Sequence, residues 1–188
     1  IDSNQVHRIL DLCCGSGCIG IASQYHFANA HVCLADLSAE ALEVAALNLQ
    51  QHDLGDVIEL YRSDLFESIP AQRFDVIVCN PPYVDAEDMA LLGEEYRCEP
   101  EIGLSAGVDG LELVDRILLS AADFLEEQGV IFIEVGNSQG AMDQKYDFLP
   151  MAWIDFEMGG AGVCCIQAQD LRQQHAAIVA ITNRAEQT

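Results

Sequence analysis

Basic residues are scarce in this sequence. Its 188 residues include 8 Lys and Arg against 31 Asp and Glu, which gives a formal net charge of −23. Binding to a nucleic-acid backbone needs clustered Lys and Arg, so this composition argues against direct nucleic-acid binding. The same charge favours an encounter with a cationic partner or cofactor, although an acidic surface also serves solubility alone.

Long hydrophobic runs and targeting patterns are also missing. No apolar stretch approaches the roughly 20 residues that span a bilayer, and no signal-peptide pattern opens the chain, so no membrane partner is predicted. The eight cysteines form no Cys-x-x-Cys pair, and several stand inside apolar runs, where free cysteine behaves as a small hydrophobe. We therefore expect reduced cysteines and a cytoplasmic location. The five histidines show no metal-ligand spacing, so no metal site is predicted.

The hydrophobic pattern predicts strands that alternate with helices. Strands are expected at residues 8–12, 31–35, 56–61, 74–79 and 130–135, and helices at 18–27, 39–51, 111–125 and 138–146. This alternation indicates an α/β fold with a doubly wound, mostly parallel, Rossmann-like sheet of seven strands. Segments 153–156 and 162–167 are too close for a helical crossover, so we expect them to close the sheet as an antiparallel hairpin. The predicted domain covers residues 1–170, and residues 171–188 are expected to form a helix or a loose tail.

The stretch Asn80, Pro81, Pro82 and Tyr83 directly follows the strand expected at 74–79. Neither proline carries an N–H that could continue a strand ladder, and a proline holds the preceding residue in an extended conformation. The loop therefore presents carbonyl oxygens and one amide side chain beyond the strand. Such acceptors suit a planar NH₂ group, although the tetrapeptide alone could also be a plain turn.

A glycine-rich turn follows the first expected strand. Residues 15–20 match the G-x-G-x-x-G pattern of dinucleotide-binding loops. Asp11, four residues before Gly15, places a carboxylate where NAD proteins usually keep an apolar residue. An acid there favours a cofactor with a cationic centre and no phosphate, and S-adenosylmethionine (SAM) has both properties.

Two further carboxylates follow the next expected strands. Asp36 ends the second strand and could accept from both ribose hydroxyls, or it could cap the following helix. Asp64 follows the third strand and could accept from the adenine amino group while Leu65 packs against the ring. Since open α/β sheets bind ligands at the carboxyl ends of their strands, these residues predict one cofactor site. The predicted cofactor-binding residues are Asp11, Cys13, Cys14, Gly15, Ser16, Gly17, Asp36, Leu37, Asp64, Leu65 and Asn80.

Over about residues 8–170, these motifs resemble the class I SAM-dependent methyltransferases, and more narrowly the protein glutamine methyltransferases. The narrower resemblance rests on residues 83–89, 95–101, 104–111 and 134–139. The family includes an enzyme that acts on release factors and one that acts on large-subunit ribosomal protein three, and the chain looks nearer to the second. Cys14 stands where threonine is more usual, and Cys98 where histidine is expected. The N-terminal helical domain with which family members recognise their protein substrate is expected to be absent from this chain.

The resemblance implies methyl transfer from SAM to the side-chain amide nitrogen of a glutamine in a translation-related protein. The Asn80 side-chain oxygen and the Pro81 carbonyl would each accept one amide N–H, and Tyr83 would pack against the amide plane. The predicted catalytic residues are therefore Asn80, Pro81, Pro82 and Tyr83.

Several alternatives stay open at this point. The substrate could be a release factor, or the loop could serve a nucleic-acid amine methyltransferase that shares the tetrapeptide. The glycine pattern by itself would also fit an NAD-dependent oxidoreductase. A non-catalytic SAM-binding fragment is a further possibility, and the sequence does not predict the oligomeric state.

Overall fold

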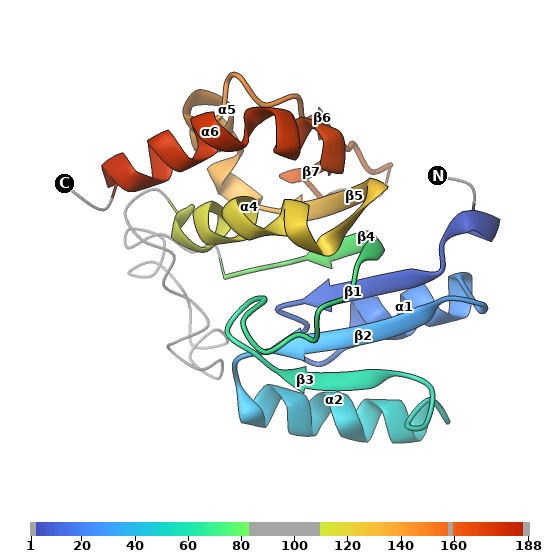
Figure 1. Cartoon of the computed structure of the whole chain (residues 1–188). Coiled ribbons are helices and arrows are strands. Elements are labelled where there is room, and N and C mark those ends of the chain that lie inside the picture. The colour runs from blue at the N-terminus through green and yellow to red at the C-terminus, as the bar shows by residue number, and fades with distance from the viewer. Residues whose placement is uncertain (1–2, 83–109, 158–159, 186–188) are drawn as a thin grey trace.

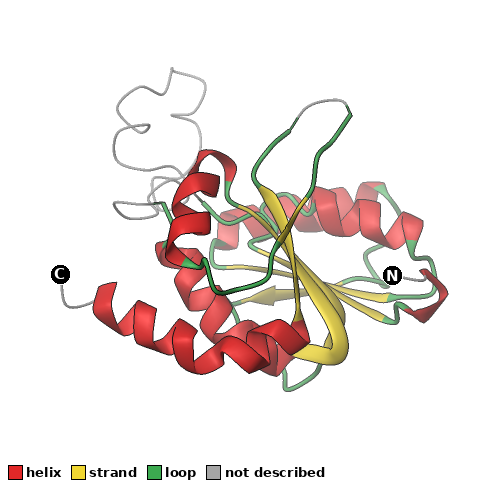
Figure 2. Ribbon diagram, turned by 90° about the horizontal axis from the view of Figure 1, so that it is seen from above, coloured by secondary structure: helices red, strands yellow, loops and turns green. Residues whose placement is uncertain are grey.

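The structure, a computed structural model, describes residues 3–82, 110–157 and 160–185. Its centre is a seven-stranded sheet in the order β3-β2-β1-β4-β5-β7-β6, and helices flank both sides of the twisted sheet (Figures 1 and 2). The strands are β1 (Arg8–Leu12), β2 (His31–Asp36), β3 (Glu59–Arg62), β4 (Phe74–Cys79), β5 (Leu125–Glu134), β6 (Ala152–Trp153) and β7 (Val163–Gln167). The helices are η1 (Ser3–Gln5), α1 (Cys18–His26), α2 (Ala39–Gln51), α4 (Glu112–Phe124), η4 (Gly136–Ser138), α5 (Gln139–Lys145) and α6 (Ala168–Ala185).

The strand pairing confirms the predicted fold class. β1 pairs in parallel with β2 and β4, β2 pairs in parallel with β3, and β4 pairs in parallel with β5. β7 pairs antiparallel with both β5 and β6, so the expected C-terminal hairpin closes the sheet. The carboxyl ends of β1, β2, β3 and β4 consequently meet at one edge, where open α/β sheets bind ligands.

Alternating side chains of the central strands pack into two separate hydrophobic cores, one on each face of the sheet. Ile9 of β1 faces the core that contains Ile21 of α1 and Leu49 of α2. Leu10 faces the opposite core, which contains Ile117 of α4. Because side chains alternate along a strand, a strand covered on both faces reads as a continuous apolar run. This explains why the sequence pattern located β1 and β4 at their observed bounds.

β5 begins earlier than the sequence predicted. The expected helix 111–125 and strand 130–135 left residues 126–129 between them, whereas the structure ends α4 at Phe124 and starts β5 at Leu125. Fully buried Leu125 already pairs with Phe74, and the register then shifts before the pairing of Val76 with Val130. This pairing across strands extends β5 back to residue 125, the last residue that the sequence pattern assigned to the helix.

Helix α6 covers much of the segment for which the sequence predicted a helix or a loose tail. Leu171 and Ile178 are buried in the core shared with α4. The Arg172 guanidinium donates to the carbonyl oxygens of Ala122 at 2.9 Å and Leu125 at 2.7 Å. It thereby satisfies acceptors that the end of α4 leaves without partners in the helix. Among the helices described, none combines the length and the apolarity needed to cross a membrane.

Candidate active site at the carboxyl edge of the sheet

Asp11 is a buried carboxylate at the centre of this edge. Its side chain is 1% exposed, and its Oδ2 accepts a hydrogen bond from the Gly20 amide at 2.8 Å. Oδ1 is buried as well, and the described residues offer it no hydrogen-bond partner. Burial raises the pKa of Asp11 to about 7, with a smaller contribution from the charge of Asp36, while the Gly20 N–H lowers it. A buried acceptor without a partner is costly unless a ligand supplies the donor.

The glycine loop needs its glycines for two different reasons. Gly15 and Gly17 have φ angles of 53° and 77°, which lie in the left-handed region that glycine adopts without strain. A Cβ on Gly20 would stand 2.1 Å from Leu34 Cδ2 and 3.1 Å from Asp11 Oδ2. Gly20 thus allows α1 to lie directly against β2, which places the loop beside Asp11.

We expect Gly20→Ala to lower the free energy of unfolding by about 1–3 kcal/mol or more, because the new methyl group overlaps Leu34. Urea denaturation of the variant and the parent chain measures this change. Gly140→Ala in α5 is the matched control, because a Cβ there meets nothing within 4 Å, and it should raise stability by about 0.5–1 kcal/mol. Equal stability of the Gly20→Ala variant and the parent would contradict the packing argument.

Asp36 ties the glycine loop to the start of α2. Its Oδ2 accepts from the Gly15 amide at 2.8 Å, and its Oδ1 accepts from the Ser38 amide at 2.9 Å. Ser38 caps α2 itself, since its Oγ accepts from the Ala41 amide at 3.1 Å. Each carboxylate oxygen of Asp36 retains a lone pair for a further donor, so its contacts within the chain leave it able to accept from a ligand hydroxyl.

Asn48 is a site residue that the sequence reasoning missed. Its side-chain amide donates from Nδ2 to the Ser16 carbonyl at 2.9 Å, which anchors the glycine loop to the last turn of α2. An asparagine inside a helical pattern carries no local signal for such a contact, because the contact depends on how α2 packs against the loop.

Asn48→Ala should therefore weaken binding of S-adenosylhomocysteine, the product that remains of SAM after methyl transfer, by about threefold to tenfold. This is the range expected for the loss of one hydrogen bond. Isothermal titration gives the dissociation constant of each variant. Gln51→Ala serves as the control, because Gln51 is an exposed residue at the end of the same helix. If both variants bind equally well, Asn48 does not position the loop.

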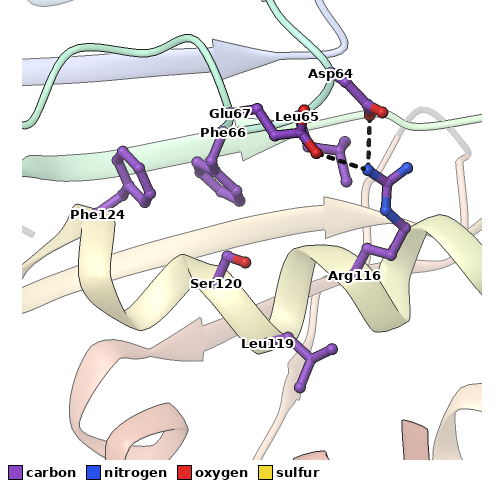
Figure 3. Close-up of a pocket in the computed structure, with 8 residues that line it drawn as sticks. All are labelled: Asp64, Leu65, Phe66, Glu67, Arg116, Leu119, Ser120 and Phe124. Atoms are coloured by element: carbon purple, nitrogen blue, oxygen red, sulfur yellow. Dashed lines mark ion pairs between the residues drawn. The ribbon is translucent and has the colours of Figure 1, made fainter. Parts of the chain in front are cut away.

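Asp64 and Leu65 lie beside an open pocket of about 480 Å³ (Figure 3). The Arg116 guanidinium reaches Asp64 Oδ1 at 2.9 Å and Glu67 Oε1 at 3.8 Å, so the acid predicted to bind adenine already has a cationic partner. The residues that line the pocket are Asp64, Leu65, Phe66, Glu67, Arg116, Leu119, Ser120 and Phe124. Asp11, Asp36 and the glycine loop are not among them.

Asn80, Pro81 and Pro82 leave β4 at the same edge. Cys79, the last residue of β4, pairs with Leu12 at the end of β1, so Asn80 follows the strand adjacent to Asp11. The Asn80 side chain is exposed and Pro81 is buried, which leaves the amide free to face a ligand. Tyr83 and the signature segments at 83–89, 95–101 and most of 104–111 lie outside the described residues.

Cysteines line the strand ends between these groups. Burial raises the pKa of the Cys14 thiol and, together with the neighbouring Cys13, that of the Cys79 thiol. Burial thus favours the uncharged form of the Cys14 and Cys79 thiols at these strand ends. The seven cysteines in the described part of the chain are all free.

The sheet order and the strand-end residues define a Rossmann-like fold of the class I methyltransferase type. Solved structures with this fold include a methyltransferase from Pyrococcus furiosus, with a TM-score of 0.64 and 17% identity over 87% of this chain and 75% of the other. A putative rRNA methylase from Clostridium thermocellum gives a TM-score of 0.60 and 16% identity over 86% of this chain and 88% of the other. At such low identities the likeness shows the fold alone.

The sequence model of the Methyltransferase small domain family matches residues 1–94, half of the 188 residues. The chain belongs to this family. It is 45% identical over 170 residues to a ribosomal protein uL3 glutamine methyltransferase of Francisella tularensis subsp. tularensis, covering 90% of this chain and 54% of the relative. A protein of the same name from Bradyrhizobium diazoefficiens is 46% identical over 166 residues, covering 88% of this chain and 52% of the relative. The chain thus spans about half the length of the curated relatives it matches.

Proposed function

We propose that this chain transfers a methyl group from SAM to the side-chain amide nitrogen of a glutamine in a ribosomal protein, namely uL3. The structural observation that carries the cofactor part of the proposal is the unpartnered, buried Oδ1 of Asp11 beside the glycine loop and Asp36. The names of the two relatives support the substrate part.

The donor groups of SAM fit the acceptors at the strand ends. Asp11 provides a buried carboxylate for a cationic part of the cofactor, and Asp36 provides acceptors for the ribose hydroxyls. Asp64 would have to share its carboxylate between the adenine amino group and Arg116, to which it is already bound. When bound, SAM supplies an electrophilic methyl group.

The Asn80 loop would position the amide nitrogen of the substrate. An amide nitrogen is a poor nucleophile because its lone pair is delocalised into the carbonyl, so orientation matters more than deprotonation. The Asn80 side-chain oxygen and the Pro81 carbonyl would each accept one N–H, and both would favour the positive charge that develops on nitrogen. Positioning of this kind supplies about 7–11 kcal/mol in favourable cases.

The charge of the chain supports a basic protein as substrate. A net charge of −23 favours encounter with a cationic ribosomal protein by electrostatic complementarity. It disfavours a nucleic-acid substrate, which the Asn-Pro-Pro-Tyr loop alone would permit. A ribosomal-protein substrate would also place the reaction in the cytoplasm.

Two measurements test this proposal in sequence. Isothermal titration should show binding of S-adenosylhomocysteine and none of NADH, and mass spectrometry should then show methylation of a glutamine in uL3 and not in release factor. The methylation assay should include one of these relatives at its full length as a positive control, because the relatives extend well beyond the matched region. Binding of NADH alone would contradict the cofactor assignment, and methylation of release factor alone would contradict the substrate.

Affinity for SAM should rise about tenfold between about pH 5.5 and pH 7 and level off above that. The reason is that the free Asp11 carboxyl has a pKa of about 7, whereas a bound cation favours its ionised form, so binding at lower pH must release a proton. Isothermal titrations with SAM across this pH range give the slope of the binding affinity against pH. The Asp11→Asn variant should bind more weakly with a nearly flat profile, and an unchanged slope in that variant would assign the pH dependence to another group.

A further inference from the structure

Three side chains with metal-binding atoms share one face of the sheet, away from the cofactor residues of β2. His31 and Cys33 are two positions apart in β2, so their side chains point to the same face. Glu59 of β3 is the register partner of Cys33 and therefore lies on that face too. The ligand atoms of the three residues all lie within 4.8 Å of one another.

The distances from the His31 ring to the other two side chains are close to the spacing of neighbouring ligands around a tetrahedral ion. His31 Nδ1 lies 3.6 Å from Cys33 Sγ, and His31 Nε2 lies 3.4 Å from Glu59 Oε1. Zinc binds nitrogen, oxygen and sulfur ligands at about 2.0–2.3 Å, which places neighbouring ligands of a tetrahedral site roughly 3.3–3.8 Å apart. These two distances involve different nitrogens of His31, so the ring would turn to bring one nitrogen into the coordination of the ion.

Neighbouring groups hold two of these ligands in place. The Tyr61 hydroxyl donates to Glu59 Oε2, which leaves Oε1 facing His31. The Gln72 side chain reaches Cys33 Sγ at 3.9 Å from the β3–β4 connection. The His31 and Glu59 side chains are 43% and 50% exposed, whereas Cys33 is fully buried, so an ion could enter from solvent and meet the thiol at the base of the site.

We propose that His31, Cys33 and Glu59 bind a divalent transition-metal ion of the zinc class, with water as the fourth ligand. Binding forms the metal–sulfur bond as the thiol proton leaves to solvent. His31 begins β2 whereas Asp36 ends it, so this metal site is separate from the proposed cofactor site. The ion would connect the edge strand β3 to β2 and stabilise that edge of the sheet.

The sequence predicted no metal site, and the topology explains why no sequence motif pointed to the one proposed here. A His-x-Cys pair is too short to be a recognisable metal motif, and Glu59 comes from another strand far along the chain. Only the parallel pairing of β2 with β3 brings the three ligands together.

Titration of the reduced chain with Co²⁺ tests this site by spectroscopy. We expect one equivalent to bind with a thiolate-to-cobalt charge-transfer band and visible bands of tetrahedral coordination, and Zn²⁺ should displace it. His31→Gln and Cys33→Ser should abolish these bands, whereas His175→Gln and Cys164→Ser should keep them, since His175 is on exposed α6 surface and Cys164 is another buried strand cysteine. Tyr61→Phe should weaken Co²⁺ binding by about tenfold, because it releases Glu59.

Thermal unfolding provides a second readout. Zn²⁺ should raise the melting temperature of the parent chain but not that of His31→Gln, and the partly exposed position of His31 predicts a small change in melting temperature without metal. If Cys33→Ser fails to fold, the His31→Gln variant alone tests whether the metal binds at this site. Absence of cobalt bands in the parent chain, or their persistence in His31→Gln, would overturn the proposal, the second because the bands would then come from other thiols.

Discussion

Asn80→Ala should lower kcat for methyl transfer by about a hundredfold to a thousandfold while changing the S-adenosylhomocysteine dissociation constant by only a few-fold. In the proposed site, the Asn80 oxygen accepts an N–H of the substrate amide and favours the positive charge that grows on nitrogen as the methyl group arrives. Loss of one preorganised hydrogen-bonding group aimed at developing charge has an effect of this size. A methyl-transfer assay, followed by titration of the same preparation, measures both quantities.

The matched control for this prediction is Asn29→Ala. Asn29 is exposed in the turn between α1 and β2, away from the loop that follows β4, so its variant should retain parent turnover. Near-normal turnover by Asn80→Ala would contradict the positioning role. A large loss of cofactor affinity with unchanged kcat would assign Asn80 to the cofactor instead.

Asp36→Ala should weaken S-adenosylhomocysteine binding by about tenfold to a hundredfold. The change removes the proposed ribose acceptor, and hydrogen bonds to charged groups contribute about 1.5–3 kcal/mol. It also releases the Gly15 and Ser38 amides, which Asp36 holds at 2.8 and 2.9 Å, so the loop loses part of its support. Isothermal titration gives the affinity, and a thermal melt separates loss of contacts from loss of fold.

Two further variants make this prediction specific. Asp36→Asn keeps an oxygen acceptor but loses the charge, so it should bind with intermediate affinity. Asp56→Ala, at an exposed turn position before β3, removes one acid away from the carboxyl edge of the sheet and should bind S-adenosylhomocysteine like the parent. A dissociation constant unchanged in Asp36→Ala would refute the ribose role.

Local patterns predicted most elements of the fold because each depends on neighbours in the chain. The apolar runs located β1 and β4 at their observed bounds, and Ser38 correctly marked the start of α2. The third strand was predicted from residue 56 but begins at Glu59. At the sheet edge its start depends on pairing with Cys33 of β2, about which local hydrophobicity carries no information.

The site residues were predicted for the same reason, where they depend on the local sequence. Asp11, the glycine loop, Asp36 and Asn80 all lie near or just beyond the carboxyl ends of strands that the sequence identified, so the parallel order of those strands brings them to one edge. The sequence did not reveal that Asp64 pairs with Arg116 of α4, because that contact joins the loop after β3 to a helix from the other half of the chain. The role of Tyr83 stays a prediction, because the residue lies outside the described part of the structure.

The sequence by itself determined the alternation of strands and helices, the acids and glycines at the strand ends, and the Asn-Pro-Pro-Tyr loop. These features depend on local propensity and on the rule that the carboxyl ends of parallel strands share an edge. Only the tertiary structure decided that Asp11 keeps one buried oxygen without a partner, that Asn48 holds the glycine loop, and that His31, Cys33 and Glu59 converge. Burial and contacts between distant segments arise when helices pack on the sheet and strands take their register, and neither is encoded in any short stretch of residues.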